Sequence, residues 1–434
     1  MDIDLSKIKK VYFIGIGGIG ISALAKFAKS KGMEVSGVND EESPATLLPL
    51  KEMGIDVILK NEYKELPIAD MYVFSDAWPY RGPEIIESAR STGKPTLSYF
   101  EALGVFAKDY KVIAIAGTHG KTTTTAMVAD VLIDAGIDPT VVVGSFVKKF
   151  KSNFREGKGE YLIVEADEFN RHFLNFKPYI TVITNIEADH FETYKDLADI
   201  ESTFSDLIKQ TKEILICDLC DESVARVVTN KDIQTVDYSK SIDLIPKLLV
   251  PGEHNRKNAA CALEVAKVLG LDVGKAILSL QNFEGTWRRL EKRGVTLNGT
   301  IIYDDYAHHP TEVRASIEGL RELYPFGSKK ITIVFQPHLY TRTKALFPEF
   351  TKCFRGADKI FLLPIYFARE DKDESVSSGK LAETICENGD KAIAFTDFEL
   401  AEEYLRGQIF GKDDIFVTMG AGEAYKVADK VFKF

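Results

Sequence analysis

Short runs of apolar, mostly β-branched or aromatic residues alternate with longer stretches of helical periodicity along the whole chain. Eight of these runs are predicted to be strands: residues 11–14, 71–74, 112–116, 161–164, 179–184, 331–335, 359–363 and 414–418. The runs are continuously apolar, which is typical of strands that are buried on both faces. The pattern therefore predicts parallel sheets covered by helices on both sides, and so an α/β protein.

The length of the chain and three glycine turns predict three domains. A chain of 434 residues holds about three domains at about 150 residues each. Three of the strands end in a glycine turn followed by a helix, at residues 15–20, 117–120 and 420–422. Charged or glycine-bearing segments near residues 108–110 and 292–294 separate helical patterns from new strands. We therefore expect domains at residues 1–108, 109–293 and 294–434.

Composition and charge exclude several classes of partner. Apolar residues make up 45% of the chain and charged residues 28%, which are ordinary globular proportions. The chain has 55 basic and 65 acidic residues, a net charge of -10, which argues against binding to a nucleic acid polymer or an anionic membrane. The acidic amino terminus lacks the features of a signal peptide, and five cysteines fit a reducing compartment. We expect a cytoplasmic protein.

The first glycine turn has the spacing of a nucleotide-binding loop. Residues 15–20 read GIGGIG between a strand and a helix, and a second strand leads to Asp40, twenty residues beyond Gly20. Glycines let the backbone approach a pyrophosphate at the helix N-terminus, and an acidic residue at this distance can bond a ribose hydroxyl. The candidate binding residues are Gly15, Gly17, Gly18, Ile19, Gly20 and Asp40. A dinucleotide dehydrogenase, a nucleotide-sugar site and a structural turn all remain possible from this loop alone.

The second glycine turn is a shortened P-loop. It follows the strand at 112–116 and opens a helix, with its first glycine at Gly117 rather than at Ile115 as the strict spacing requires. Its backbone N–H groups can cradle phosphate, Lys121 can reach the β- and γ-phosphates, and the Thr122 hydroxyl can hold Mg²⁺. The candidate ATP-binding residues here are Gly117, Thr118, His119, Gly120, Lys121, Thr122 and Thr123. A simple dehydrogenase does not need this second loop.

Two acidic segments follow strands of the predicted central domain, at residues 165–168 and 185–190. Side chains at the carboxyl ends of parallel strands face the crevice where ligands bind in such sheets. Oxygen-rich ligand sets favour Mg²⁺ that bridges to substrate phosphates, although solvated loop carboxylates would have the same composition. All seven histidines lie near strand ends or in polar motifs, which favours a shared active-site region.

In this order, the motifs resemble those of the Mur ligase family over essentially the whole chain. The matching segments are residues 15–22, 117–125, 251–259, 304–312 and 335–343. The family consists of ATP-dependent amide-bond-forming enzymes of bacterial cell-wall precursor synthesis. The resemblance implies three domains: a Rossmann-like N-terminal domain for the UDP sugar, a central P-loop domain for ATP, and a Rossmann-like C-terminal domain for closure and the amino acid.

One segment and one absence point to a particular branch of this family. Residues 335–343 resemble the loop that receives incoming alanine, and residues 196–207 contain no lysine of the kind that later-acting members carbamylate. The implied reaction joins L-alanine to the lactyl carboxylate of UDP-N-acetylmuramate through an acyl phosphate, with release of ADP and phosphate. The implied partners are UDP-N-acetylmuramate, L-alanine, ATP and Mg²⁺, and we expect a monomer or a weak homodimer.

The resemblance also assigns roles near the phosphates. Lys121 would clamp the β- and γ-phosphates, and Thr122 would hold one Mg²⁺ ion. Glu165 and His190 match the ligands of a second Mg²⁺ ion. Arg289 resembles an arginine near the phosphates, although Arg288 and Arg289 could instead form a charged surface between domains.

Further roles implied by the resemblance fall in the last third of the chain and just before it. The residues expected to contact ATP there are His254, Asn255, Asn258, Asp305 and His308. His338 and Arg342 would orient alanine, Arg342 through the alanine carboxylate. Two places depart from the family pattern: Leu339 stands where arginine is frequent, and residues 169–172 (FNRH) follow the acidic strand end where acidic and small residues are expected.

Three other functions remain compatible with parts of the sequence. A recycling ligase would attach a whole murein tripeptide to the same sugar nucleotide, but should lack the loop at residues 335–343. An NAD-dependent oxidoreductase would explain residues 15–20 and Asp40, but not the P-loop. A non-catalytic regulator that binds a nucleotide sugar would share the fold without the activity.

Overall fold

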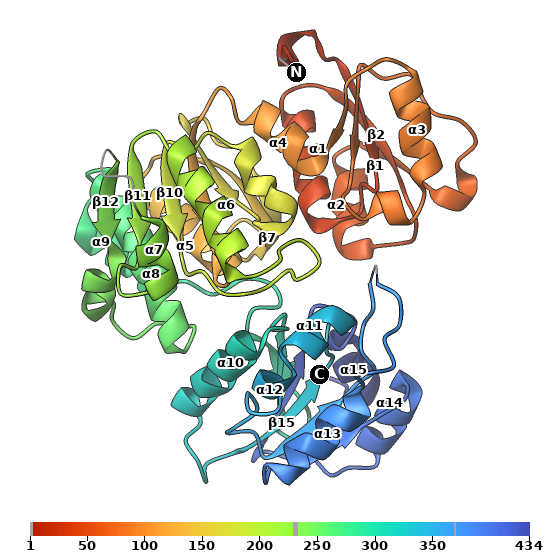
Figure 1. Cartoon of the computed structure of the whole chain (residues 1–434), viewed down its shortest axis with the longest axis vertical. Coiled ribbons are helices and arrows are strands. Elements are labelled where there is room, and N and C mark those ends of the chain that lie inside the picture. Colours follow the sequence, from red (N-terminus) through yellow and green to blue (C-terminus); the bar gives the residue numbers. More distant parts are fainter. Residues whose placement is uncertain (1–2, 229–232, 369) are drawn as a thin grey trace. The chain divides into compact units, whose positions relative to one another are not determined.

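The computed structural model describes residues 3–228, 233–368 and 370–434, which form two compact units. The first unit comprises Met1–Glu187, Leu197–Ile245 and Asn258–Leu280. The second comprises Ala188–Asp196, Pro246–Lys257 and Gln281–Phe434. Three sheets are present, two in the first unit and one in the second, so the predicted α/β class is confirmed (Figure 1). In the part of the chain that is described, no helix has the length and apolar character needed to cross a membrane.

The amino-terminal sheet is entirely parallel, with strand order β3-β2-β1-β4-β5. Its strands are β1 (Lys10–Ile14), β2 (Glu34–Asn39), β3 (Asp56–Leu59), β4 (Met71–Phe74) and β5 (Thr96–Ser98). Its helices are α1 (Ile19–Ser30), α2 (Pro44–Glu52), α3 (Pro83–Ser91) and α4 (Tyr99–Phe106). Three short 3-10 helices accompany them: η1 (Leu5–Lys7), η2 (Lys60–Glu62) and η3 (Trp78–Tyr80). Helix α3 packs with Tyr12 and Ile14 of β1 in one apolar cluster.

The central sheet, also in the first unit, has the order β12-β11-β10-β6-β9-β7-β8. Its strands are β6 (Lys111–Ala116), β7 (Thr140–Val147), β8 (Ser152–Arg155), β9 (Tyr161–Glu165), β10 (Ile180–Ile183), β11 (Ile214–Cys217) and β12 (Gln234–Asp237). The associated helices are α5 (Lys121–Asp134), η4 (Phe169–Asn175), α6 (Leu197–Gln210), α7 (Glu222–Val227), η5 (Tyr238–Leu244), α8 (Glu253–Val268) and α9 (Val273–Gln281). Only the β7–β8 pairing is antiparallel among the ladders described for this sheet.

The sheet of the second unit has the order β13-β14-β18-β15-β16-β17. Its strands are β13 (Glu291–Val295), β14 (Ile301–Asp305), β15 (Lys330–Phe335), β16 (Lys359–Leu362), β17 (Ala392–Ala394) and β18 (Asp414–Met419). Its helices are α10 (Pro310–Leu323), α11 (Tyr340–Ala345), α12 (Phe347–Phe350), α13 (Ser378–Glu387), α14 (Phe398–Arg406) and α15 (Tyr425–Val431). The β13–β14 pair is antiparallel at one edge, whereas the other described pairs are parallel.

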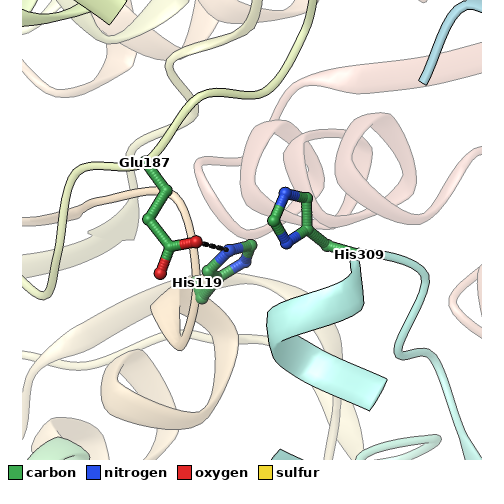
Figure 2. Close-up of side chains that lie close together, drawn as sticks. All are labelled: His119, Glu187 and His309. Carbon is green, nitrogen blue, oxygen red and sulfur yellow. Dashed lines mark ion pairs between the residues drawn. The ribbon is translucent and has the colours of Figure 1, made fainter. Parts of the chain in front are cut away.

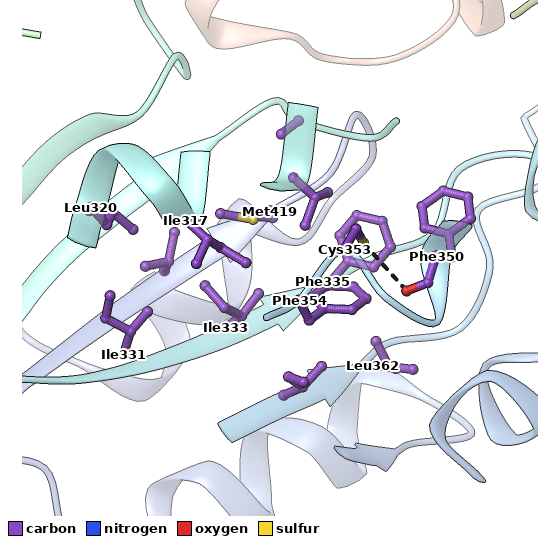
Figure 3. Packing of buried hydrophobic residues seen from close by; sticks show 14 of the residues in the cluster. Ile317, Leu320, Ile331, Ile333, Phe335, Phe350, Cys353, Phe354, Leu362 and Met419 are labelled. Carbon is purple, nitrogen blue, oxygen red and sulfur yellow. Dashed lines mark hydrogen bonds between the residues drawn. The ribbon is translucent and has the colours of Figure 1, made fainter. Parts of the chain in front are cut away.

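The second-unit sheet is buried on both faces, as its continuous apolar strands predict. Ile331, Ile333 and Phe335 of β15 pack on one face with α10, α12 and α13 (Figure 3). The intervening Val334 packs on the opposite face with α14 and α15. Alternate residues of the same strand thus enter different cores, which explains why nearly every buried position of β15 is apolar.

All eight strands expected from apolar runs are present, as β1, β4, β6, β9, β10, β15, β16 and β18. The pattern did not distinguish the edge strands β3, β5, β12 and β17, which are only partly buried and have mixed composition. It also left out β7 and β14, which are interior and mostly buried, and their partners β8 and β13. It also did not predict the two antiparallel pairs. Edge strands contact a neighbour on one side only, so they lack the continuous apolar run that marks a central strand.

Candidate active site

The first glycine loop has a backbone that only glycine permits at its first position. Gly15 follows β1 with φ +81°, and its N–H donates to the carbonyl of Val38 at 2.8 Å. A Cβ atom at Gly15 would lie 2.9 Å from the Trp78 ring and would overlap the Ser75 hydroxyl. The backbone therefore passes close to β2 and β4 before α1 begins, as a nucleotide-binding loop requires.

The end of β2 presents two polar side chains to different partners. The Gly17 N–H donates to Asn39 Oδ1 at 2.9 Å, and the Thr46 hydroxyl donates to the Gly17 carbonyl at 2.6 Å. The adjacent Asp40, expected to bind ribose, forms an ion pair with Arg81. Sequence reasoning missed Asn39, although its place as the last residue of β2 was a usable signal. Asn39 and Thr46 hold the loop, and Asp40 remains the partly exposed acidic group.

The phosphate loop is also shaped by glycine. Gly117 and Gly120 have φ values of +131° and +82°. A Cβ atom at Gly120 would lie 2.5 Å from Oδ1 of Asn258, so the predicted ATP residue Asn258 lies directly against the loop. Asn185 holds the phosphate loop through two hydrogen bonds. Its backbone carbonyl accepts from the Thr118 N–H at 3.1 Å, and its side-chain Oδ1 accepts from the His119 N–H at 2.9 Å.

Lys121 is folded over its own loop and paired with a carboxylate. Its Nζ donates to Glu168 Oε2 at 2.8 Å and to the carbonyls of Gly117 and Thr118 at 2.7 and 3.1 Å. Burial alone would lower the pKa of Lys121, but the Glu168 carboxylate outweighs it and raises that pKa above its ordinary value. Lys121 is therefore a cation held next to the loop that precedes α5.

Thr122 and Glu165, two of the predicted metal ligands, are in direct contact. The Thr122 hydroxyl donates to Glu165 Oε1 at 2.8 Å, and the Gly144 N–H donates to Glu165 Oε2 at 2.8 Å. A hydroxyl and a carboxylate supply oxygen donors of the kind that Mg²⁺ prefers. The two side chains therefore fit a magnesium ion next to the phosphate loop.

An imidazole and a carboxylate lie beside the same loop. His119 Nε2 is 3.6 Å from Glu187 Oε2 (Figure 2). The Glu187 N–H also donates to the Thr118 hydroxyl at 2.9 Å. The segment after β10 thus contacts the phosphate loop through both backbone and side chain.

In the second unit, Arg342 forms a buried ion pair with Asp189. Its Nε donates to Asp189 Oδ1 at 2.7 Å and one terminal nitrogen donates to Oδ2 at 3.3 Å. The two side chains are only 3% and 6% exposed. Burial would raise the pKa of Asp189, but Arg342 holds it well below its usual range. The other terminal nitrogen lies 3.2 Å from Nδ1 of His338, so the two predicted alanine-binding residues are adjacent.

His308 lies beside His338 and is held in its neutral form. The two ring centroids are 5.8 Å apart. Burial lowers the pKa of His308 to about 4, and its Nδ1 lies 2.9 Å from the Tyr306 carbonyl. A neutral imidazole at this distance donates its Nδ1–H to that carbonyl, which leaves Nε2 as an acceptor.

Asp305 is buried at the end of β14. It accepts hydrogen bonds from the Ser316 hydroxyl and from the Ala307 N–H, the latter at 3.2 Å. Burial raises the pKa of Asp305 to about 6, although Ser316 and Arg289 act in the opposite direction.

The raised pKa of Asp305 predicts a pH-dependent stability. Its contribution to stability is full below the unfolded pKa of about 3.9 and is lost as the pH rises through about 6. We expect the unfolding free energy of the wild type, minus that of Asp305→Asn, to fall by roughly 2 kcal/mol between about pH 4 and about pH 7. Urea denaturation at several pH values measures this difference. A difference that stays constant with pH would contradict the prediction.

The remaining predicted ATP residues lie near the start of α8. Burial lowers the pKa of His254 to about 4, so its imidazole is neutral at neutral pH. The side-chain amide of Asn255 donates to the Pro251 carbonyl at 2.7 Å. His254 and Asn255 belong to the second unit and Asn258 to the first, because the chain passes from one unit to the other within α8.

Sequence profiles of one family match the chain in three successive parts. They are described as "Mur ligase family, catalytic domain" at residues 10–111, "Mur ligase middle domain" at 115–245 and "Mur ligase, glutamate ligase domain" at 288–422. The "UDP-N-acetylmuramate--L-alanine ligase" of Clostridium acetobutylicum is 38% identical over 450 residues, which covers 97% of each chain. The chain belongs to the Mur ligase family.

Further relatives agree with this assignment. The protein of the same name from Clostridium perfringens is 36% identical over 464 residues and 100% of both chains. The crystal structure of the UDP-N-acetylmuramate-alanine ligase of Thermotoga maritima matches with a TM-score of 0.77 at 26% identity, covering 97% of this chain and 98% of that one. The chain therefore has the three-domain α/β fold of Mur ligases, with a parallel central sheet.

The two adjacent arginines, Arg288 and Arg289, differ in burial and in their contacts. Arg288 is 5% exposed and donates to Asp304 at 2.7 Å and to the Gly420 carbonyl at 2.7 Å. The alternative that Arg288 forms a charged surface is therefore wrong, because its guanidinium is enclosed by β14 and the turn after β18. Arg289 is more exposed and lies 5.1 Å from the Tyr306 ring, with Glu312 at 3.8 Å.

The two departures from the Mur ligase pattern have distinct surroundings. Leu339 is buried with φ +70°, and its N–H donates to the Tyr366 carbonyl at 2.8 Å. It precedes α11, so an apolar side chain occupies the core where the pattern often has arginine. His172 lies in η4 and stacks on Phe100, with ring centroids 4.4 Å apart.

His190, the remaining predicted metal ligand, belongs to the segment grouped with the second unit. Its backbone is left-handed, with φ +53°, and its carbonyl accepts from the Thr193 N–H at 2.7 Å. The structure thus brings together Lys121, Thr122 and Glu165 in the first unit. It brings together His308, His338 and Arg342 in the second.

Proposed function

We propose that this chain is an ATP-dependent ligase that joins L-alanine to the lactyl carboxylate of UDP-N-acetylmuramate in peptidoglycan precursor synthesis. The observation that carries the proposal is full-length similarity, at 36–38% identity, to proteins named for this reaction. The phosphate loop and the loop after β15 supply side chains whose chemistry suits its two steps. The Gly-Lys-Thr loop at residues 120–122 favours a ligase over a dinucleotide-dependent oxidoreductase.

In the first proposed step, a carboxylate oxygen of the substrate attacks the γ-phosphorus of ATP, and ADP leaves with the electrons of the broken P–O bond. Negative charge accumulates on crowded phosphate oxygens during this step. Lys121 is a cation at the phosphate loop, and it would exchange the Glu168 carboxylate for the β- and γ-phosphates. Arg289 would add a second positive charge, and loop N–H groups would orient the phosphates.

Thr122 would hold one magnesium ion, and Glu165 would be a ligand of a second. Magnesium would supply charge neutralisation on the phosphate oxygens. Because the Thr122 hydroxyl already donates to Glu165 at 2.8 Å, both oxygens are positioned by the fold before a ligand arrives. Gly144 keeps the second oxygen of Glu165 in place.

In the second proposed step, the alanine amine attacks the acyl carbon, phosphate leaves, and the nitrogen loses a proton. Arg342 would bind the alanine carboxylate, with His338 beside it. The Arg342 guanidinium is already paired with the buried carboxylate of Asp189. The alanine carboxylate would therefore have to compete with Asp189 for Arg342. His254, Asn255, Asn258, Asp305 and His308 would contact ATP, and Gly15, Gly17, Gly18, Ile19, Gly20 and Asp40 the UDP sugar.

The direct test is the dependence of phosphate release on the amino acid. We expect purified protein with UDP-N-acetylmuramate, ATP and Mg²⁺ to release phosphate when L-alanine is added, and to stop when Mg²⁺ is chelated. The matched arm replaces alanine with L-alanyl-γ-D-glutamyl-meso-diaminopimelate. Turnover with the tripeptide alone would assign the chain to recycling, and absence of turnover in both arms would favour a non-catalytic role.

We also propose a cytoplasmic location, as a monomer or a weak homodimer. The motivating observations are the cysteine usage and the nucleotide substrates. The proposed domain limits are residues 1–108, 109–293 and 294–434. Sedimentation analysis over a range of concentrations would report the oligomeric state, and a stable higher oligomer would contradict the proposal.

A further inference from the structure

A carboxylate without a close donor lies beside the nucleotide loop of the first unit. Asp76 follows Ser75, whose N–H donates to the Ile14 carbonyl of β1 at 2.9 Å and whose side chain abuts Gly15. The Asp76 side chain is 27% exposed, and the basic group near it is His172, with Nε2 at 3.4 Å from Oδ1. Among the described residues, no other side chain donates a hydrogen bond to this carboxylate.

His172 reaches Asp76 from the central sheet. His172 is 8% exposed, and its Nδ1 atom is buried with no hydrogen-bond partner in the described part of the chain. The ring is held between Phe100, at 4.4 Å, and Phe169, at 5.6 Å. A buried imidazole that lacks strong hydrogen bonds is costly, and the Asp76 carboxylate beside its Nε2 helps to offset that cost.

The segment that carries His172 is fixed in an unusual conformation. Asn170 and Arg171 both have left-handed backbone, with φ +48° and +59°. The Arg171 guanidinium donates to Asp199 of α6 at 2.6 Å. The same segment begins at Glu168, the partner of Lys121, so His172 is placed by the loop that also contacts the phosphate loop.

The Asp76 carboxylate lies near enough to Tyr99 to act on it. Burial raises the pKa of Tyr99, and the carboxylates of Glu165, Asp76 and Asp167 raise it further. A Cβ atom at Gly20 would lie 2.9 Å from the Tyr99 ring, so the same tyrosine also contacts the first glycine loop. A sugar nucleotide bound at the first glycine loop would therefore lie near Tyr99 and Asp76.

The charges around Asp76 indicate which chemical group of a ligand could bind to it. Asp167 and Glu101 also act on Asp76, and both are carboxylates. A further anionic group would be repelled here, whereas a neutral donor would pair with the carboxylate.

We propose that Asp76 accepts a hydrogen bond from a hydroxyl or amide N–H of the amino sugar in the sugar nucleotide, and that His172 is the positioning residue that holds Asp76. The proposal rests on the proposed function for the identity of the sugar nucleotide. It assigns a substrate role to the segment that departs from the family pattern.

The test compares binding of UDP-N-acetylmuramate with binding of UDP by calorimetry. We expect Asp76→Ala to weaken binding of UDP-N-acetylmuramate about ten-fold or more, with UDP affinity unchanged. Asp76→Asn keeps an acceptor oxygen and should lose less. His172→Ala should also weaken binding of UDP-N-acetylmuramate. His172→Gln should keep part of the lost affinity, because the glutamine amide can donate to Asp76. The double variant Asp76→Ala/His172→Ala should bind about as weakly as Asp76→Ala alone.

Steady-state kinetics of the same variants separates substrate positioning from general damage. We expect KM for UDP-N-acetylmuramate to rise while kcat and KM for ATP change little. Glu87→Gln, an exposed carboxylate on α3, is the matched control and should match the wild type. Equal losses for UDP and UDP-N-acetylmuramate, or an unchanged affinity in Asp76→Ala, would overturn the proposal. A wild type that binds both ligands but shows no alanine-dependent turnover would contradict the proposed function alone.

Discussion

Replacing Lys121 with alanine should reduce phosphate release about 1000-fold while UDP-N-acetylmuramate still binds. The lysine is the cation closest to the phosphate loop, and phosphoryl transfer depends on positive charge that stabilises the transferring oxygens. The first glycine loop lies on a different sheet and has its own hydrogen bonds, one donated to Asn39 and one accepted from Thr46. Single-turnover ADP release and calorimetry with the sugar nucleotide measure the two effects separately.

The control for this variant must account for Glu168. Removing Lys121 leaves a buried carboxylate without its cation, which costs about 3–5 kcal/mol of stability. The double variant Lys121→Ala/Glu168→Gln removes both charges and should recover stability without recovering activity. Recovery of activity would show that Lys121 has a structural role only, and loss of sugar-nucleotide binding in the folded double variant would contradict separate roles for the two loops.

Replacing Arg342 with alanine should raise KM for L-alanine about 10- to 100-fold, with a smaller change in KM for ATP. The guanidinium makes a bidentate buried pair with Asp189, which is the geometry that a free carboxylate would need. Losing a charged hydrogen-bonded contact corresponds to about 1.5–3 kcal/mol of binding free energy. Initial rates with alanine varied at saturating ATP and UDP-N-acetylmuramate measure the effect.

Asp189→Asn is the matched control for Arg342. It removes the internal carboxylate that competes with alanine but leaves the guanidinium in place. If alanine displaces Asp189, the asparagine variant should have a KM for alanine at or below that of the wild type. If the pair only holds the segment after β10, both substitutions should impair the enzyme alike, and the alanine-binding role of Arg342 would be wrong. Thermal unfolding of Arg342→Ala/Asp189→Asn controls for the cost of an unpaired buried charge.

Local motifs made most of the fold predictable. The apolar runs of β1, β6 and β15 are continuous because both faces of each strand are covered, and this is visible without tertiary information. The glycine turns at Gly15 and Gly117 were equally predictable from the sequence, because a positive φ next to a packed neighbour excludes other residues. Partly buried edge strands such as β3 and β17 were not predictable, since their composition differs little from that of loops.

The residues of the candidate site were identified from the sequence, but the contacts between them were not. Lys121, Thr122 and Glu165 were identified from their motifs, but the contact between Thr122 and Glu165 joins a helix start to a strand end. Asn39 rather than Asp40 binds the first glycine loop, because one residue along a strand reverses the direction of the side chain.

By itself, the sequence determined the α/β class, the positions of the nucleotide loops and the resemblance to Mur ligases. These depend on short segments whose backbone preferences and burial are set locally. Only the tertiary structure decided the partners of the charged groups: Glu168 for Lys121, Asp189 for Arg342 and Asp76 for His172. The reason is physical, since each pair joins segments far apart in the chain, and a buried charge takes whichever opposite or polar group the packing of strands and loops brings within reach.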